Sequence, residues 1–176
     1  PYEAEFMEQI EKYRKRDVGW TREFKGVSDC KFVISGHPDD FQVLPSRRVA
    51  HVEYKTTKRQ YKADGTPKLE FIERFKLCMA RFQVQIYTWI MEPIYAELGY
   101  YADAVHAVAY YDSGNFKHLK TYCVEYRSQN VEADLTRIVN IIKNPEFCIA
   151  PKKFKCKMCY PELKTKCPLW LQEHGQ

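Results

Sequence analysis

Three residues in the first third of the chain have the types and spacing of a metal-dependent hydrolytic site: Asp39, Glu53 and Lys55. Glu53 and Lys55 are two residues apart in an alternating segment that predicts a strand, so both side chains leave the same face. Asp39 lies at the turn between the two preceding predicted strands, which could bring its carboxylate beside Glu53. Two carboxylates and the backbone carbonyl of Tyr54 would supply the oxygen ligands that Mg²⁺ or Mn²⁺ prefers.

A divalent cation at such a site would neutralise phosphate charge and lower the pKa of a bound water, which supplies hydroxide near neutral pH. Lys55 beside that water would orient it and stabilise the charge that develops on the phosphate oxygens. The three residues therefore predict phosphodiester hydrolysis. Glu-x-Lys pairs are common as exposed charge pairs that contribute little, so this prediction depends on the order of the motifs along the chain.

Two polar residues further along the chain add to that order. Gln83 and Tyr87 are spaced i, i+4, so on a helix they share one face. An amide and a phenol that point at the sheet could hold Lys55 or a phosphate group by hydrogen bonds. Taken alone, each residue is also typical of an ordinary helix surface.

The remaining pattern predicts one α/β domain with a mixed sheet. Apolar periodicity and turn residues indicate a helix at 2–16, strands at 30–35, 41–44 and 50–56 in a three-strand meander, a polar loop at 58–68, a helix at 69–98 with an irregularity at Pro93, strands at 102–111 and 119–126 around a turn at 112–115, and a helix at 131–143. The meander carries the charged trio, and the long helix carries the amide and the phenol.

The composition is that of a folded, moderately basic protein. Hydrophobic residues make up 45% of the 176 residues, which excludes global disorder. The net charge of +5 permits an acidic partner without requiring one. Cations and rings are interleaved most densely at Lys58, Arg59, Tyr61 and Lys62. Cations that follow phosphates beside rings that stack on bases predict binding of single-stranded DNA by this loop.

The sequence contains no run of 18 apolar residues, which predicts no membrane span, and its charged first residues are not typical of a signal peptide. The seven cysteines are an odd number. This favours an intracellular protein (in the cytoplasm, or in the host cytoplasm for a viral protein) over a disulfide framework. Cys78 and Cys123 stand among apolar residues and are expected in the core.

Three cysteines near the C-terminus have the spacing of a metal centre. Cys156, Cys159 and Cys167 give Cys-x₂-Cys-x₇-Cys, and Cys148 would complete a local set of four. Thiolates at this spacing can close on zinc or on an iron–sulfur cluster. Residues 148–176 are therefore expected to form a cysteine-rich extension that packs on a core of residues 1–147.

The ordered motifs resemble those of a known enzyme superfamily. Gly36–Asp39, then Val52–Thr57 with its Glu-x-Lys, then Gln83–Tyr87 are similar to the motifs of PD-(D/E)xK nucleases. Within that superfamily the chain looks most like the RecB-type branch, which includes the CRISPR-associated exonucleases. The resemblance covers residues 25–170. Each motif is short and weakly specific alone, and their order is considerably more specific.

The resemblance implies a restriction-endonuclease-like core, with a mixed β-sheet flanked by helices. In the family the acidic pair binds Mg²⁺ or Mn²⁺, the lysine assists catalysis and the helix with Gln83 and Tyr87 supports the site. An N-terminal helix usually adds a metal ligand, and here Glu8 and Glu11 compete for that role, with His37 as an alternative. The C-terminal cysteines hold a [4Fe–4S] cluster in this branch, with zinc or no metal as alternatives because the fourth ligand is not matched.

The sequence thus predicts a divalent-metal-dependent DNA nuclease that prefers single-stranded DNA or DNA ends, in exonuclease or endonuclease mode. A non-cleaving module that binds DNA or protein on the same fold is the alternative. A structural protein with zinc or a cluster is the third interpretation. Each of them is compatible with a homo-oligomer.

Overall fold

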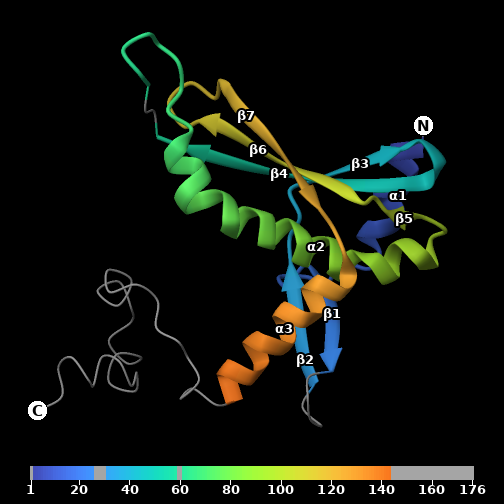
Figure 1. Cartoon of the computed structure of the whole chain (residues 1–176). Helices are drawn as coiled ribbons and strands as arrows, with labels where there is room; N and C mark the ends of the chain where they lie inside the picture. Colours follow the sequence, from blue (N-terminus) through green and yellow to red (C-terminus); the bar gives the residue numbers. More distant parts are fainter. Residues whose placement is uncertain (1, 26–30, 59–60, 144–176) are drawn as a thin grey trace, which may run out of the picture.

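The computed structural model describes residues 2–25, 31–58 and 61–143, which form an α/β fold with a mixed sheet flanked by helices (Figure 1). The elements are α1 (Tyr2–Glu11), β1 (Trp20–Lys25), β2 (Lys31–Gly36), β3 (Asp40–Leu44), the 3₁₀ turn η1 (Pro45–Arg47), β4 (Arg48–Thr57), the π-helical turn η2 (Ile72–Lys76), α2 (Leu77–Glu97), β5 (Tyr101–Ala102), β6 (Val105–Asp112), β7 (His118–Glu125) and α3 (Ser128–Lys143). Within the described residues, no helix combines the length and apolar character needed to cross a membrane.

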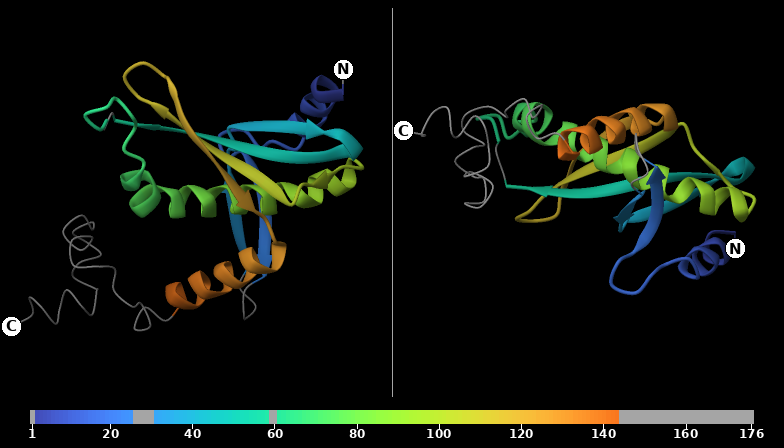
Figure 2. Two further views of the ribbon diagram at one scale, coloured as in Figure 1. Left: turned by 45° about the horizontal axis from the view of Figure 1, so that its top comes forward. Right: turned by 90° about the horizontal axis from the view of Figure 1, so that it is seen from below.

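The larger sheet has the strand order β3-β4-β6-β7, and the short β5 also pairs with β4. β3 is antiparallel to β4, β4 is parallel to β6, and β6 is antiparallel to β7. A parallel pair needs a crossover connection, and α2 supplies it between β4 and β6. Figure 2 shows α2 lying along one face of this sheet.

The core lies between α2 and the sheet. Val84 of α2 and Val108 of β6 are fully buried in one cluster of this layer. At the other end of the sheet, Phe6 of α1 is fully buried, and its ring lies 6.2 Å from that of Phe41 and 5.8 Å from that of Tyr95. These contacts attach α1 to the region where β3 and the C-terminal half of α2 meet.

The predicted three-strand meander is wrong. β2 pairs with β1 in a separate two-stranded ribbon, and only β3 and β4 form the expected hairpin. The break at Gly36-His37-Pro38 ends the ribbon instead of turning β2 onto β3. The sequence pattern does not predict β1, because polar and charged residues (Thr21, Arg22 and Glu23) separate Trp20 and Phe24, the two buried residues of the strand.

The first helix ends at Glu11, before the predicted residue 16. The chain then turns back through Asp17 and Gly19, which have positive φ values of 64° and 80°. The predicted core positions of Cys78 and Cys123 are also wrong, because both thiols are exposed. On β7 the buried positions are Tyr122 and Val124, so alternation turns Cys123 to the opposite face.

Pro93 lies inside α2, where it has no N–H to donate to the Trp89 carbonyl four residues earlier. Arg22 of β1 replaces that donor, with its Nη1 2.6 Å from the Trp89 oxygen. The same guanidinium lies 3.2 Å from the Glu92 carboxylate and 4.0 Å from the centre of the Trp89 ring. The helix therefore tolerates a proline because β1 packs against it.

We expect Arg22→Ala to lower the free energy of unfolding by about 1–3 kcal/mol, because the Trp89 carbonyl loses its donor. Pro93→Ala restores the helical N–H, so Arg22→Ala should cost less in that background. Urea denaturation of the four proteins in a double-mutant cycle measures the difference. Equal losses in both backgrounds would mean that Arg22 acts through its ion pair and ring contact instead.

Two histidines lie side by side on the face of the sheet that α2 covers: His51 on β4 and His106 on β6, each 2% exposed. The His51 backbone N–H donates to Nδ1 of His106 at 2.9 Å, and Nε2 of His51 pairs with the Tyr95 hydroxyl. Burial lowers the pKa of His106 to about 4 and the pKa of His51 well below its usual value. Both rings are therefore neutral in the folded protein near pH 7.

This pair makes the fold sensitive to acid. Below the ordinary histidine pKa of about 6.5 the unfolded chain takes up protons that the folded chain does not, so stability falls as the pH falls from 6.5 to about 4. For His106 alone we expect a loss on the order of 3 kcal/mol across that window. Urea denaturation at several pH values gives the free energy of unfolding as a function of pH. This free energy should fall less steeply with decreasing pH in His106→Gln than in the wild type, and as steeply as in the wild type in the exposed control His118→Gln. Because His51 remains in His106→Gln, part of the pH dependence should persist, and a pH dependence equal to that of the wild type would contradict the role of His106.

Candidate active site

The charged trio assembles at the edge of β4. Glu53 and Lys55 point to the α2 side of the sheet, where Nζ of Lys55 lies 2.5 Å from Oε1 of Glu53. Asp39 lies in the turn before β3, and its Oδ2 accepts a hydrogen bond from the Tyr54 backbone N–H at 2.9 Å. The structure thus brings the three predicted residues together, two from a strand and one from a turn.

The helix face predicted to support the site does so by a chain of hydrogen bonds. Lys55 donates to Oε1 of Gln83 at 2.9 Å, and the amide nitrogen of Gln83 donates to the Tyr87 hydroxyl oxygen at 2.6 Å. Because the Tyr87 oxygen accepts in this bond, the hydroxyl proton of Tyr87 is not used in it and can be donated to another group. The ammonium is held between a carboxylate and an amide, which fixes its position.

Glu53 is a carboxylate with little access to water, with 2% of its surface exposed. Burial raises its pKa, the hydrogen bond from Lys55 opposes that rise, and the negative charge of Asp39 adds to it. Asp39 and Glu53 together carry two negative charges, and the single positive charge of Lys55 balances only one of them. A cation bound between Asp39 and Glu53 would balance the remaining negative charge.

The backbone of Tyr54 faces the same place. β3 pairs with β4 as far as Val52, and beyond that point this edge of β4 meets Asp39. The N–H and C=O of one strand residue point to the same edge, so the Tyr54 carbonyl points to the edge occupied by the Asp39 carboxylate. This arrangement agrees with the predicted set of oxygen donors, and two carboxylates with a carbonyl suit Mg²⁺, which keeps several waters.

Gly36 positions Tyr87, a role that the Gly36–Asp39 motif alone does not predict. A Cβ at Gly36 would lie 2.4 Å from Cε1 of Tyr87, so only glycine lets the Tyr87 ring pack on the end of β2. The Asp40 carboxylate was also missed; it accepts from the Tyr54 hydroxyl at 2.8 Å. The available signals were a glycine just before the turn and two consecutive aspartates.

We expect Gly36→Ala to displace the Tyr87 ring and lower the free energy of unfolding by about 1–3 kcal/mol, as overpacking does. A misplaced Tyr87 also weakens the support of Gln83 and Lys55. Thermal denaturation of Gly36→Ala and of Gly36→Ala with Tyr87→Ala tests the cause. If removing the ring does not make the glycine substitution less costly, the contact with Tyr87 is not the reason for the loss.

The structure does not bring the candidates for a third metal ligand to the trio. Among the described residues, no three side chains of the types His, Cys, Asp and Glu are grouped to hold a metal. Glu8 is exposed on α1, and Glu11 pairs with Arg14 at 3.5 Å. The His37 ring lies over Gly19, where a Cβ would be 2.7 Å from its Nε2.

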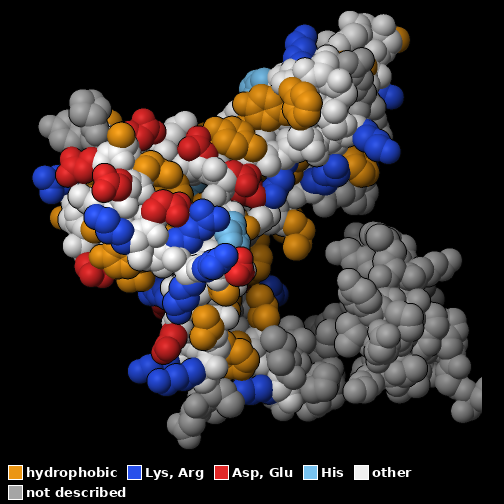
Figure 3. Space-filling view, turned by 180° about the vertical axis from the view of Figure 1, so that it is seen from behind, with side chains coloured by type: hydrophobic (Ala, Val, Ile, Leu, Met, Phe, Trp, Pro, Cys, Tyr) orange, Lys and Arg blue, Asp and Glu red, His pale blue; other side chains and the backbone are white. Residues whose placement is uncertain are grey.

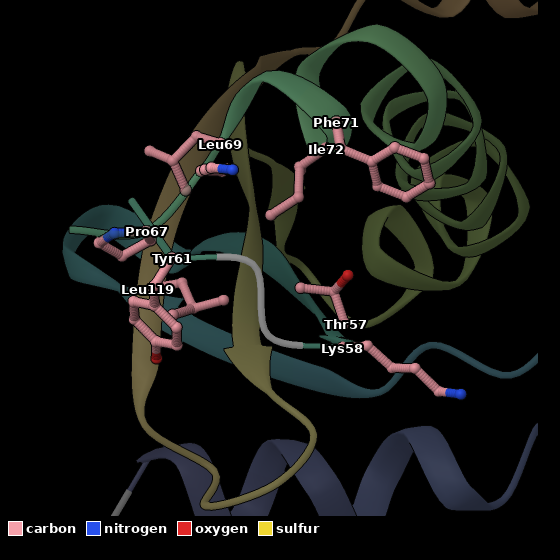
Figure 4. A pocket seen from close by; sticks show the side chains of 9 residues that line it. Thr57, Lys58, Tyr61, Pro67, Leu69, Phe71, Ile72 and Leu119 are labelled. Carbon is pink, nitrogen blue, oxygen red and sulfur yellow. The ribbon is translucent and has the colours of Figure 1, made fainter. Parts of the chain in front are cut away.

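The predicted DNA-binding loop continues from the end of β4. Lys58 and Lys62 are exposed, whereas the Tyr61 hydroxyl donates to Asp112 at 2.8 Å. Figure 4 shows side chains of this loop and of η2 around a cavity of about 10 Å³, room for about one water molecule, which makes it a packing feature and no ligand site. Arg59 lies outside the described residues, as do the four cysteines of the predicted metal centre: Cys148, Cys156, Cys159 and Cys167.

Comparisons with known proteins bear on the fold alone. No protein-family model matches the sequence, and no curated protein matches it. Among solved structures, the crystal structure of SSO0001 is similar, with a TM-score of 0.50 and 16% sequence identity. The alignment covers 84% of this chain and 56% of SSO0001, so the chain spans little more than half of that protein. The two proteins share a fold.

Proposed function

We propose that the protein is a divalent-metal-dependent DNA nuclease with a restriction-endonuclease-like core of the PD-(D/E)xK type. The observation that carries the proposal is the convergence of Asp39, Glu53, Lys55 and Gln83 at one edge of β4. Sequence order alone does not require these residues to meet. Exposed charge pairs do not need a buried carboxylate or a lysine held from two sides, and this site has both.

The donor set fits a hard cation. Asp39 and Glu53 would hold Mg²⁺ or Mn²⁺ together with the Tyr54 carbonyl, and their mutual repulsion favours a bound cation over none. When bound, the cation would neutralise phosphate charge and make hydroxide available near neutral pH.

The protein side chains would then position the substrate. Lys55 cannot rotate freely, because Glu53 and Gln83 both accept from its ammonium. An ammonium fixed in this way can orient the attacking water and stabilise negative charge on the scissile phosphate with little reorganisation. The Tyr87 hydroxyl, which accepts from Gln83, keeps a proton that it can donate to a phosphate oxygen.

The cysteine set is a separate proposal, drawn from the sequence. Cys156, Cys159 and Cys167, with Cys148 as the candidate fourth ligand, would hold a [4Fe–4S] cluster or zinc. Anaerobic purification followed by a visible absorbance spectrum and metal analysis separates these cofactors. A colourless protein with stoichiometric zinc would show that the cysteines hold zinc and not a cluster.

End-labelled linear single-stranded and double-stranded DNA and internally labelled circular DNA, each incubated with Mg²⁺, Mn²⁺ or EDTA, test the proposed activity. We expect metal-dependent cleavage of single strands or ends, and circular substrates separate the endonuclease mode from the exonuclease mode. Binding without cleavage across these metals would favour the alternative, a DNA-binding module on the same fold.

A further inference from the structure

A row of three rings crosses the sheet on the face opposite α2. Tyr54 of β4, Tyr111 of β6 and His118 of β7 form this aromatic row, with centroids 6.0 Å and 5.4 Å apart. Alternation places Glu53 and Lys55 on the α2 side and Tyr54 on the other. Figure 3, which views the molecule from behind, shows large hydrophobic side chains beside a histidine in its upper right part, where the end of the sheet with the β6–β7 turn lies.

The rings at both ends of the aromatic row are held by hydrogen bonds at their polar atoms. The Tyr54 hydroxyl donates to the Asp40 carboxylate at 2.8 Å, and Nε2 of His118 lies 2.8 Å from the Thr121 hydroxyl. Tyr54 is nevertheless 42% exposed. Rings that are fixed yet exposed are ready to bind a flat ligand at little cost in conformational entropy.

The aromatic row begins at the candidate active site. The Tyr54 backbone N–H binds the Asp39 carboxylate, so the first ring of the row comes from a residue that contacts the proposed metal site. Lys117, in the β6–β7 turn directly before His118, is exposed and places a cation at the His118 end of the row. Exposed rings beside a cation match a ligand with flat groups on an anionic backbone.

Building on the proposed nuclease function, we propose that the aromatic row is a stacking platform for the unpaired bases of single-stranded DNA. Neighbouring rings are inclined by 61° and 66°, so they do not cover one another's faces. Their spacing also exceeds the rise of about 3.4 Å between stacked bases. The row therefore suits bases that are splayed apart, and a duplex, whose bases are stacked and paired, has no free base face to offer it.

Fluorescence anisotropy in EDTA, where no strand is cut, tests the platform with two probes: labelled oligothymidylate and an abasic deoxyribose-phosphate strand of equal length. We expect the wild type to prefer the strand with bases, and Tyr111→Ala to weaken that binding by about 5- to 100-fold. Tyr111→Ala should leave abasic binding unchanged, and Tyr111→Phe should retain base-dependent binding. Tyr101→Ala removes a ring that is 66% exposed on β5 and serves as the matched control.

Equal affinity of the wild type for the two strands, or an equal loss of both in Tyr111→Ala, would overturn the platform. Circular dichroism checks the fold of each variant, and His118→Ala provides the same test at an exposed position if Tyr111→Ala does not fold. The outcome is independent of cleavage. Base-dependent binding without metal-dependent cleavage would support the stacking platform and contradict the nuclease function. Metal-dependent cleavage without a preference for the strand with bases would support the nuclease function and contradict the platform.

Discussion

Replacing Lys55 with methionine is expected to lower the single-turnover rate of DNA cleavage by about 10²- to 10³-fold, the usual effect of removing one fixed group that stabilises developing charge. Methionine keeps much of the aliphatic length and removes the ammonium. Loss of Lys55 also removes the hydrogen bond that lowers the Glu53 pKa, so the acidic limb of the pH–rate profile should move to higher pH.

Lys31→Met, at an exposed position on β2, is the matched control and should cleave at the wild-type rate. The pH profile matters because a shift of the acidic limb would show that the reaction depends on the Glu53 carboxylate, whose pKa Lys55 lowers. A Lys55→Met protein that cleaves at the wild-type rate would remove Lys55 from the catalytic site.

Glu53→Gln is expected to abolish the thermal stabilisation that Mn²⁺ gives the wild-type protein. A ligand at 100 times its dissociation constant stabilises a protein by about 2.7 kcal/mol, which for a chain of this size raises the melting temperature by roughly 5–10 °C. The amide keeps the size of the side chain and removes its charge. Glu125→Gln, at an exposed position on β7, should retain the full shift.

The same experiment has a defined pH dependence. Protons compete with the metal for the Glu53 carboxylate, whose pKa is raised by burial. The wild-type shift should therefore shrink as the pH falls toward that raised pKa. A Mn²⁺ shift of equal size in Glu53→Gln would place the cation elsewhere on the protein.

Much of the candidate site could be predicted because its parts are local. The alternation around Val52 and Tyr54 predicts a strand with Glu53 and Lys55 on one face, and β4 confirms it. The i, i+4 spacing of Gln83 and Tyr87 predicts one helix face, and α2 confirms it. Hydrophobic period and residue spacing depend only on residues close in sequence, so they predict these local features without knowledge of the tertiary structure.

What the sequence pattern did not predict depends on pairing between distant segments. β2 joins β1 and not β3, and no local signal in Lys31–Gly36 specifies which strand it will meet. The aromatic row has the same origin, because Tyr54, Tyr111 and His118 become neighbours only through the register of three strands. The same holds for α1, whose place depends on the packing of Phe6 against Phe41 and Tyr95; among the described residues, Glu8 and Glu11 of this helix do not complete a three-ligand group with the site.

The most direct test of the central claim is single-turnover cleavage of a labelled single-stranded oligonucleotide by the wild type and by Asp39→Asn, each with Mn²⁺ and with EDTA. Asp39 contributes a carboxylate from a turn, so the substitution alters the proposed metal site without touching the ion pair of Glu53 with Lys55. We predict cleavage by the wild type with Mn²⁺ and at least a 100-fold lower rate in the three other reactions, a loss on the order of that for a key electrostatic group. Cleavage by Asp39→Asn at the wild-type rate, or cleavage in EDTA, would contradict a metal-dependent nuclease site at the edge of β4.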